Sequence, residues 1–130
     1  MKGLKTLGAA FKASRLYGRS LRLLRSGRSR EALDAARTGL ALLSDSGVSR
    51  DGPAAPALGT THLMLTIQVE QLGNELGEPR ASPTDLAVAA NFIRAMPDST
   101  DEQSAEIKCK WLPYIEGRLA AITDDSARQS

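Results

Sequence analysis

Five basic residues near the start of the chain have the side-chain types and the spacing needed to bind anions. Lys12, Arg15, Arg19 and Arg22 follow one another at steps of three or four residues. On an α-helix, with about 100° per residue, they and Lys5 fall within about a third of the circumference. Guanidinium groups donate paired hydrogen bonds to carboxylates and phosphates. The candidate partner-binding residues of this segment are therefore Lys5, Lys12, Arg15, Arg19 and Arg22.

The charge distribution along the chain supports this interpretation. The first 30 residues carry nine basic and no acidic side chains, whereas the remaining 100 carry eight basic and fifteen acidic ones. Such asymmetry is typical of an interaction surface. The pattern favours a protein partner with an acidic surface. Four alternatives stay open: a nucleic acid or an anionic membrane, a second copy of the chain, the chain's own acidic surface, and a merely solvated helix face.

The residues that most often perform catalysis do not form a recognisable set. His62 is the one histidine, and it falls on the apolar face of an expected helix. Cys109 is the one cysteine, and we expect it to be buried. Asp98, Asp101 and Glu102 gather where a helix begins, which capping and the helix dipole explain. No phosphate-binding loop, nucleophile elbow or zinc motif occurs. We expect no enzyme activity, no metal and no cofactor.

An aromatic cluster near the carboxyl end is the second candidate binding feature. Trp111 and Tyr114 flank Pro113, which removes one backbone hydrogen bond and bends or breaks a helix. Trp111 lies on the apolar stripe, so we expect it to be largely buried. Because Trp and Tyr are frequent hot-spot residues, Trp111 and Tyr114 are also candidate partner anchors.

The elements that position these residues are all predicted to be helices, since no segment alternates with a period of two. Gly27, Gly77 and Pro97 end helices, and Ser29, Ser82 and Ser99 are expected N-caps. These signals predict a small all-α bundle of about five helices, as a single domain over residues 1–123 with a flexible tail at 124–130. The expected helices are 4–26, 30–43, 58–76, 82–96 and 99–122.

The sequence also predicts which side of the first helix faces the core, and this side differs from the one that carries the basic row. At 3.6 residues per turn, its large apolar residues gather on one broad side. These residues are Leu4, Leu7, Phe11, Tyr17, Leu21 and Leu24. Leu16 and Leu23 fall beyond the basic row, which leaves open that this helix packs on two sides.

Residues 13–45 resemble one tetratricopeptide repeat. Gly27 stands at the turn between the two helices, and "REALDAARTGLALL" has the form of the second helix, with Ala32 at its small position and Leu40 and Leu42 at its apolar end. The chain departs from the family's pattern at Leu16, Arg19, Ser20, Gly39 and Ser44 and contains a single copy. The resemblance implies an antiparallel helical hairpin inside the bundle.

Composition narrows the class of protein further. The single cysteine excludes an intrachain disulfide, and the longest uncharged run, 52–69, is too polar to span a membrane. Twelve arginines against five lysines are typical of a GC-rich bacterial source. We therefore expect a cytoplasmic, non-enzymatic interaction module of the adaptor, chaperone or toxin-neutralising type. The alternative is a binder of nucleic acid or of an anionic membrane surface through the same basic helix.

Overall fold

The computed structural model describes residues 2–45, 55–96 and 101–129, and their secondary structure is helical, with no strand. The all-α prediction is confirmed. The chain forms two compact units, Met1–Ala81 and Ser82–Ser130, where the sequence suggested one domain. Within the described part of the chain, no helix is both long enough and apolar enough to cross a bilayer.

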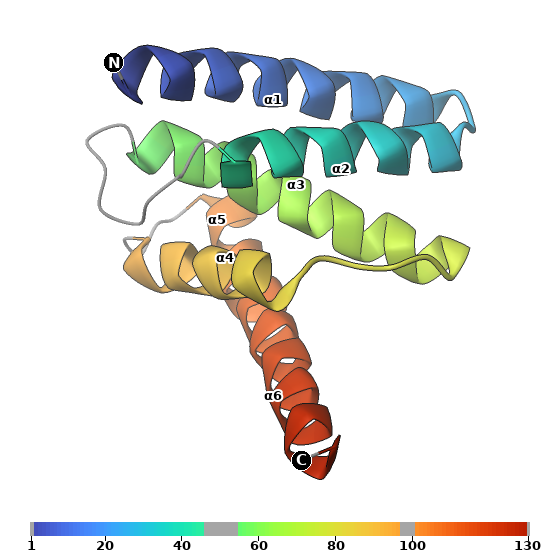
Figure 1. The fold of residues 1–130 in the computed structure, drawn as a ribbon, viewed down its shortest axis with the longest axis vertical. Helices are drawn as coiled ribbons and strands as arrows, with labels where there is room; N and C mark the ends of the chain where they lie inside the picture. The colour runs from blue at the N-terminus through green and yellow to red at the C-terminus, as the bar shows by residue number, and fades with distance from the viewer. Residues whose placement is uncertain (1, 46–54, 97–100, 130) are drawn as a thin grey trace. The chain divides into compact units, whose positions relative to one another are not determined.

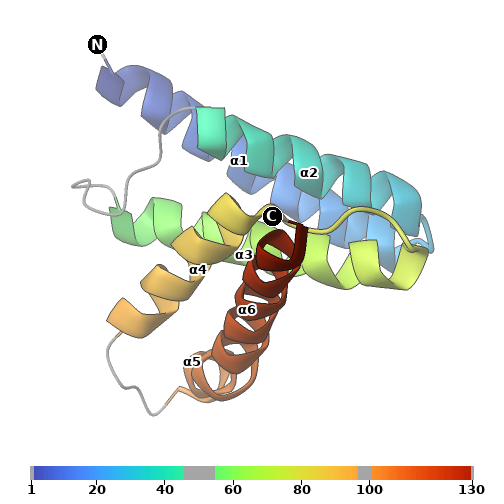
Figure 2. The ribbon, with the colours of Figure 1, turned by 60° about the horizontal axis from the view of Figure 1, so that its bottom comes forward.

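The first unit consists of three helices that run up, down and up. They are α1 (Lys2–Arg25), α2 (Ser29–Asp45) and α3 (Ala55–Leu76). Figure 1 shows α1 and α2 side by side and antiparallel, with α3 running back along α2, and Figure 2 shows the same arrangement from below. The predicted loop between α2 and α3 falls largely at 46–54, outside the described residues. The third helix begins at Ala55, three residues earlier than the sequence indicated.

The turn between α1 and α2 lies at Gly27, as predicted. Gly27 has φ of +79°, a left-handed conformation that glycine adopts without steric penalty. The Arg28 amide donates to the Leu23 carbonyl oxygen at 2.9 Å, and the Gly27 amide donates to that of Leu24 at 3.1 Å. These two bonds form a Schellman motif, which satisfies the last carbonyls of α1. Ser29 is already the first residue of α2, so its prediction as an N-cap was wrong.

Small residues bring α1, α2 and α3 close together. Ala13 and Ser20 of α1 are completely buried, as are Ala32 and Ala36 of α2. A Cβ atom on Gly39 would lie 3.2 Å from Leu65 Cδ1 of α3 and 3.4 Å from Leu16 Cβ of α1. The three helices therefore meet at a point where there is no space for a larger side chain.

The prediction of which residues of α1 face the core was wrong near both ends of the described part of this helix. Phe11 is 74% exposed and Leu24 is 37% exposed, while the buried side carries alanine and serine. The prediction followed the largest apolar side chains. A tightly packed helix pair instead selects the smallest residues at its crossing, and these contribute little to a hydrophobic pattern.

Helix α3 follows the predicted apolar stripe. His62, Leu65, Val69 and Leu72 are buried, and Leu76 ends the helix. Gly77, with φ of +67°, then reverses the chain, and the Glu78 amide donates to the Gly73 carbonyl oxygen at 2.9 Å.

The segment after Gly77 folds back over α3. A Cβ atom on Gly73 would approach the carbonyl oxygens of Pro79 and Glu78 to 3.0 and 3.2 Å. The amide of Ala81 donates to the carboxylate of the buried Glu70 at 3.2 Å. Residues 78–81 are therefore a packed strap that belongs to the first unit.

The second unit contains α4 (Pro83–Ala95), α5 (Glu102–Glu106), the π-helical turn η1 (Ile107–Trp111) and α6 (Leu112–Gln129). Ser82 caps α4 as predicted, since its hydroxyl accepts from the Asp85 amide at 3.2 Å. The last helix begins at a different residue, because Asp101 accepts from the Ser104 amide at 3.2 Å. The predicted cap Ser99 lies outside the described residues. Helix α6 continues to Gln129, so the expected flexible tail is helical in its described part.

The predicted break at Pro113 takes the form of the π-helical turn. The amide of Leu112 donates to the Ile107 carbonyl oxygen, five residues back, and α-helical bonding resumes at Leu112. Proline has no amide hydrogen, and its ring crowds the carbonyl four residues earlier, here that of Cys109. The wider turn relieves this crowding. Helix α4 packs against η1 and α6 with its buried residues Leu86, Ala89, Ala90 and Ile93.

Candidate partner-binding site

The predicted basic row of α1 borders a hollow in the first unit. Two half-buried leucines, one from each of the paired helices α1 and α2, lie among its basic side chains. This basic hollow has a volume of about 360 Å³ and is lined by Lys12, Arg15, Leu16, Arg19, Arg22 and Leu42. The structure therefore brings together four of the five predicted basic residues. The side chain of the fifth, Lys5, lies outside the described residues.

The cations of the basic hollow have no counter-ion among the described side chains of their own unit. Among the described side chains of residues 8–81, none is hydrogen-bonded or ion-paired to the side chain of Lys12, Arg15, Arg19 or Arg22. Like charges at such spacing repel one another along a helix. An anionic group supplied from outside this unit would reduce that repulsion.

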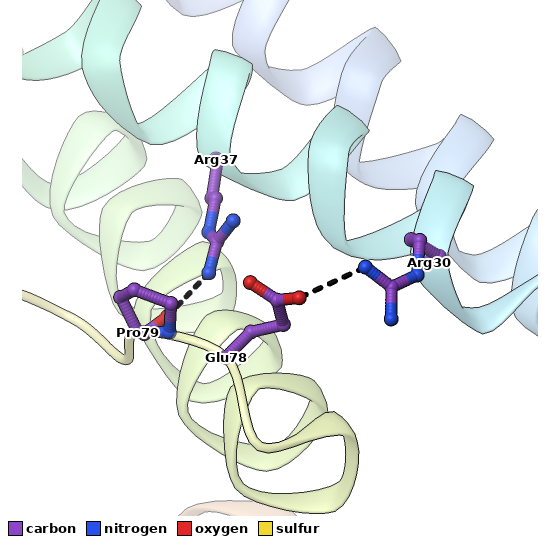
Figure 3. A network of polar contacts seen from close by, with 4 residues as sticks. All are labelled: Arg30, Arg37, Glu78 and Pro79. Carbon is purple, nitrogen blue, oxygen red and sulfur yellow. Dashed lines mark hydrogen bonds and ion pairs between the residues drawn. The ribbon is translucent and has the colours of Figure 1, made fainter.

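Two arginines of α2, Arg30 and Arg37, are bound to residues of the strap at 78–81 (Figure 3). Arg30 Nη1 lies 2.8 Å from Glu78 Oε1, and Arg37 Nη2 donates to the Pro79 carbonyl oxygen at 2.6 Å. Arg28 Nη1 lies 3.6 Å from Glu31 Oε2. The long basic segment read from the sequence therefore divides into two groups. In one group, Arg28 and Arg30 are paired with the carboxylates of Glu31 and Glu78; the other group, on α1, has no such pair among the described side chains.

The structure adds apolar residues to the site that sequence reasoning missed. Leu42 belongs to α2, and its place beside α1 depends on how the hairpin closes. Phe11 was assigned to the core, yet it is exposed directly before Lys12 and one helical turn before Arg15. In the sequence, such a surface is indicated by large apolar residues that are interrupted at short intervals by arginines.

A second hollow lies on the other side of the row formed by Arg15 and Arg22. It has a volume of about 480 Å³ and is lined by Arg15, Gly18, Leu21, Arg22 and Arg25. Arg25, like its neighbours, has no ion-pair partner among the described side chains of the first unit. Arg15 and Arg22 thus form a ridge with a hollow on each side.

The aromatic candidates lie in the second unit. The rings of Trp111 and Tyr114 meet edge to face, with centroids 5.5 Å apart and an interplanar angle of 82°. Lys110 Nζ lies 5.7 Å from the centroid of the Trp111 ring. Trp111 is half-buried, and Tyr114 is 37% exposed. Trp111 lies at the end of the π-helical turn, and its ring packs on that of Tyr114.

His62 and Cys109, the two residues considered for catalysis, differ in their burial. His62 is buried, and its Nδ1 lies 3.5 Å from the hydroxyl of Thr66, one helical turn along α3. Cys109 is exposed on η1, which corrects the expectation of a buried thiol. Within the described ranges, no three His, Cys, Asp or Glu side chains are grouped so that they could hold a metal ion.

No protein-family model matches this chain, and no curated protein and no solved structure matches it significantly.

Proposed function

We propose that this protein is a non-enzymatic helical interaction module that binds an acidic protein surface through the basic face of α1. The observation that carries the proposal is the basic hollow, in which four cations surround Leu16 and Leu42 and have no counter-ion among the side chains that the structure describes in residues 8–81. The tetratricopeptide-like hairpin of α1 and α2 would serve as the rigid support of this surface.

The mixture of charge and recessed leucines favours a protein over other anionic partners. Duplex DNA presents phosphates that lysine and arginine bind without apolar contacts. A bilayer surface is flat and does not reach half-buried leucines between two helices. A protein side chain can enter the hollow, while neighbouring carboxylates form charge-assisted hydrogen bonds with the arginines.

One observation favours an anionic membrane as the second candidate. Phe11 is 74% exposed beside Lys12, and an exposed aromatic residue on a basic helix can insert at the lipid headgroup boundary. The alternative function is therefore a peripheral binder of anionic lipid surfaces.

The test compares three probes. The first is a pair of acidic peptides, each of about 20 residues and so about 30 Å long as a helix. The two peptides have the same composition, and their glutamates and leucines are spaced to form an amphipathic helix. They differ in the position of their prolines, which lie at the ends of one peptide and in the middle of the other. The second is a short DNA duplex, and the third is a phosphatidylserine vesicle with a phosphatidylcholine control. We expect an acidic peptide to bind, and neither the duplex nor the vesicle to bind as tightly.

The variants are matched in charge. Arg15→Gln, Arg19→Gln and Arg22→Gln together should weaken peptide binding at least about tenfold, since one hydrogen bond to a charged group contributes about 1.5–3 kcal/mol. The control removes three charges elsewhere, through Arg94→Gln, Lys108→Gln and Lys110→Gln, and should retain binding. Equal binding by both triple variants, or binding of the duplex or the vesicle alone, would contradict the proposal.

A further inference from the structure

Gly18 lies in the middle of α1, and no contact within the fold explains why this residue is a glycine. A Cβ atom added there would meet nothing within 4 Å, and its φ is not positive. Glycine is the least favourable helix-interior residue after proline. The fold requires glycine at Gly27 and Gly77 for the left-handed turns and at Gly73 for close packing, whereas an added Cβ atom at Gly8 or Gly117, as at Gly18, meets nothing within 4 Å. Of these three positions, Gly18 is the one that lines a described hollow. At Gly18, the described part of the chain gives no such requirement.

The surroundings of Gly18 indicate what could approach it. The hollow around it is bordered by Arg15, Arg22 and Arg25, with Leu21 as its apolar residue. Three guanidinium groups therefore surround a stretch of bare helix backbone. Ion binding at the tips of arginine side chains does not need this backbone to be accessible. A ligand that packs against α1 itself does need it, because the side chains at a helix crossing set the distance between the helix axes.

We propose that the partner presents an acidic α-helix that crosses α1 at Gly18, with carboxylates bound by Arg15 and Arg22 on either side of the crossing. This inference rests on the proposed function and adds the secondary structure and contact point of the partner. Arg15 and Arg22 are seven residues apart, which is about 10.5 Å along a helix. A partner helix that crosses α1 at a small angle presents glutamates at this spacing when they too are seven residues apart.

The arrangement also distinguishes a helix from other anionic ligands. Phosphates of a duplex or of lipid headgroups could be held at the arginine tips, above the backbone. A partner helix instead places a small residue over Gly18 and buries Leu21 under its own apolar side chains. Paired hydrogen bonds between guanidinium and carboxylate groups then fix its register.

The test replaces Gly18 and measures stability and affinity in the full-length chain. Gly18→Ala should raise the melting temperature, because alanine is the best helix former, yet it should weaken binding of the helical acidic peptide. Gly18→Leu should weaken binding more strongly, by about tenfold or more, as a larger side chain separates the two helices. The peptide with prolines in its middle should bind more weakly than its isomer with prolines at the ends.

The matched control is Gly117→Ala in α6, where an added Cβ atom also meets nothing within 4 Å. It should raise the melting temperature and leave the affinity for the helical peptide unchanged. If Gly18→Leu binds the helical peptide as tightly as the unaltered chain, the crossing at Gly18 is refuted. The proposed function is then judged separately by the triple glutamine variant, which would still lose binding if the basic row is the site. Equal affinity for the two peptide isomers would refute the helical partner alone.

Discussion

The hydroxyl of Ser20 donates a hydrogen bond of 2.7 Å to the carbonyl oxygen of Ala32, across the interface of α1 and α2. The same hydroxyl accepts a hydrogen bond of 3.3 Å from Gln68 Nε2 of α3. All three residues are buried. One small polar side chain therefore connects the three helices that support the basic face, and Arg19 and Leu21, its neighbours in sequence, point away from it to the two hollows.

Removing this hydroxyl should destabilise the first unit. Ser20→Ala deletes both bonds and leaves the buried Gln68 amide without this acceptor, which should lower the free energy of unfolding by about 1–3 kcal/mol. Urea unfolding followed by circular dichroism measures the change. Ser26→Ala is the control, since the Ser26 hydroxyl donates to the Arg22 carbonyl oxygen at an exposed position. If the two variants are equally stable, the buried network contributes no more than a surface bond.

The strap at residues 78–81 should depend on Gly73. Gly73→Ala places a methyl group 3.0 Å from the Pro79 carbonyl oxygen, which the Arg37 guanidinium holds at 2.6 Å. Overpacking against backbone atoms typically costs about 1–3 kcal/mol. Thermal unfolding should show a lower melting temperature for Gly73→Ala, and Gly117→Ala should show the opposite sign. An increase in stability for Gly73→Ala would mean that the strap moves to accommodate the methyl group without loss of free energy of unfolding.

The hairpin turn should tolerate asparagine better than alanine. Gly27→Ala forces a Cβ atom into the left-handed conformation, which costs about 1–2 kcal/mol. Gly27→Asn should cost less, because asparagine adopts this conformation at helix ends. Chemical denaturation of the two variants gives the order directly. Equal stability of Gly27→Ala and the unaltered chain would show that the turn has another conformation in solution.

Tyr17 should make stability fall in alkaline solution. Partial burial raises the pKa of the Tyr17 phenol above its ordinary value of 10.0. The folded state therefore holds this proton more tightly than the unfolded state. Its contribution to stability is fully present below the unfolded pKa and is lost as the pH rises through the folded pKa.

Tyr17→Phe should flatten this alkaline loss of stability while leaving the other tyrosine in place. Unfolding by urea at neutral and at alkaline pH measures the slope, and ultraviolet titration of tyrosinate, compared between the two proteins, isolates the Tyr17 transition. A Tyr17 transition at or below pH 10.0 would contradict the raised pKa.

Local signals in the sequence were sufficient for the helices and several of their ends. Gly27, Gly77 and Ser82 act at their own positions through backbone conformation and capping, so their effects can be read without the tertiary structure. The core side of α1 could not be found in this way. It is defined by Ala13 and Ser20, whose burial depends on how closely α2 and α3 approach.

The candidate site was partly predictable for the same reason. The basic row depends only on spacing along one helix, and four of its five predicted members line the basic hollow. Leu42 comes from another helix, and the pairing of Arg30 with Glu78 joins residues 48 positions apart. Helical periodicity contains no information about such distant partners. The separation of bound from available arginines therefore required the fold.

The π-helical turn at Ile107–Trp111 has a consequence for how the last helix can vary in length. Such a turn accommodates about one residue more than an α-helical turn. Deleting Cys109 alone would restore the crowding between the Pro113 ring and a preceding carbonyl, so the deletion combined with Pro113→Ala should restore α-helical geometry and keep Ile115 buried. An insertion of one residue into a regular helix would instead rotate all later side chains by about 100°. Around Pro113 the chain thus has a local site of length tolerance, where a single-codon deletion combined with Pro113→Ala would preserve the packing of α6 against α4.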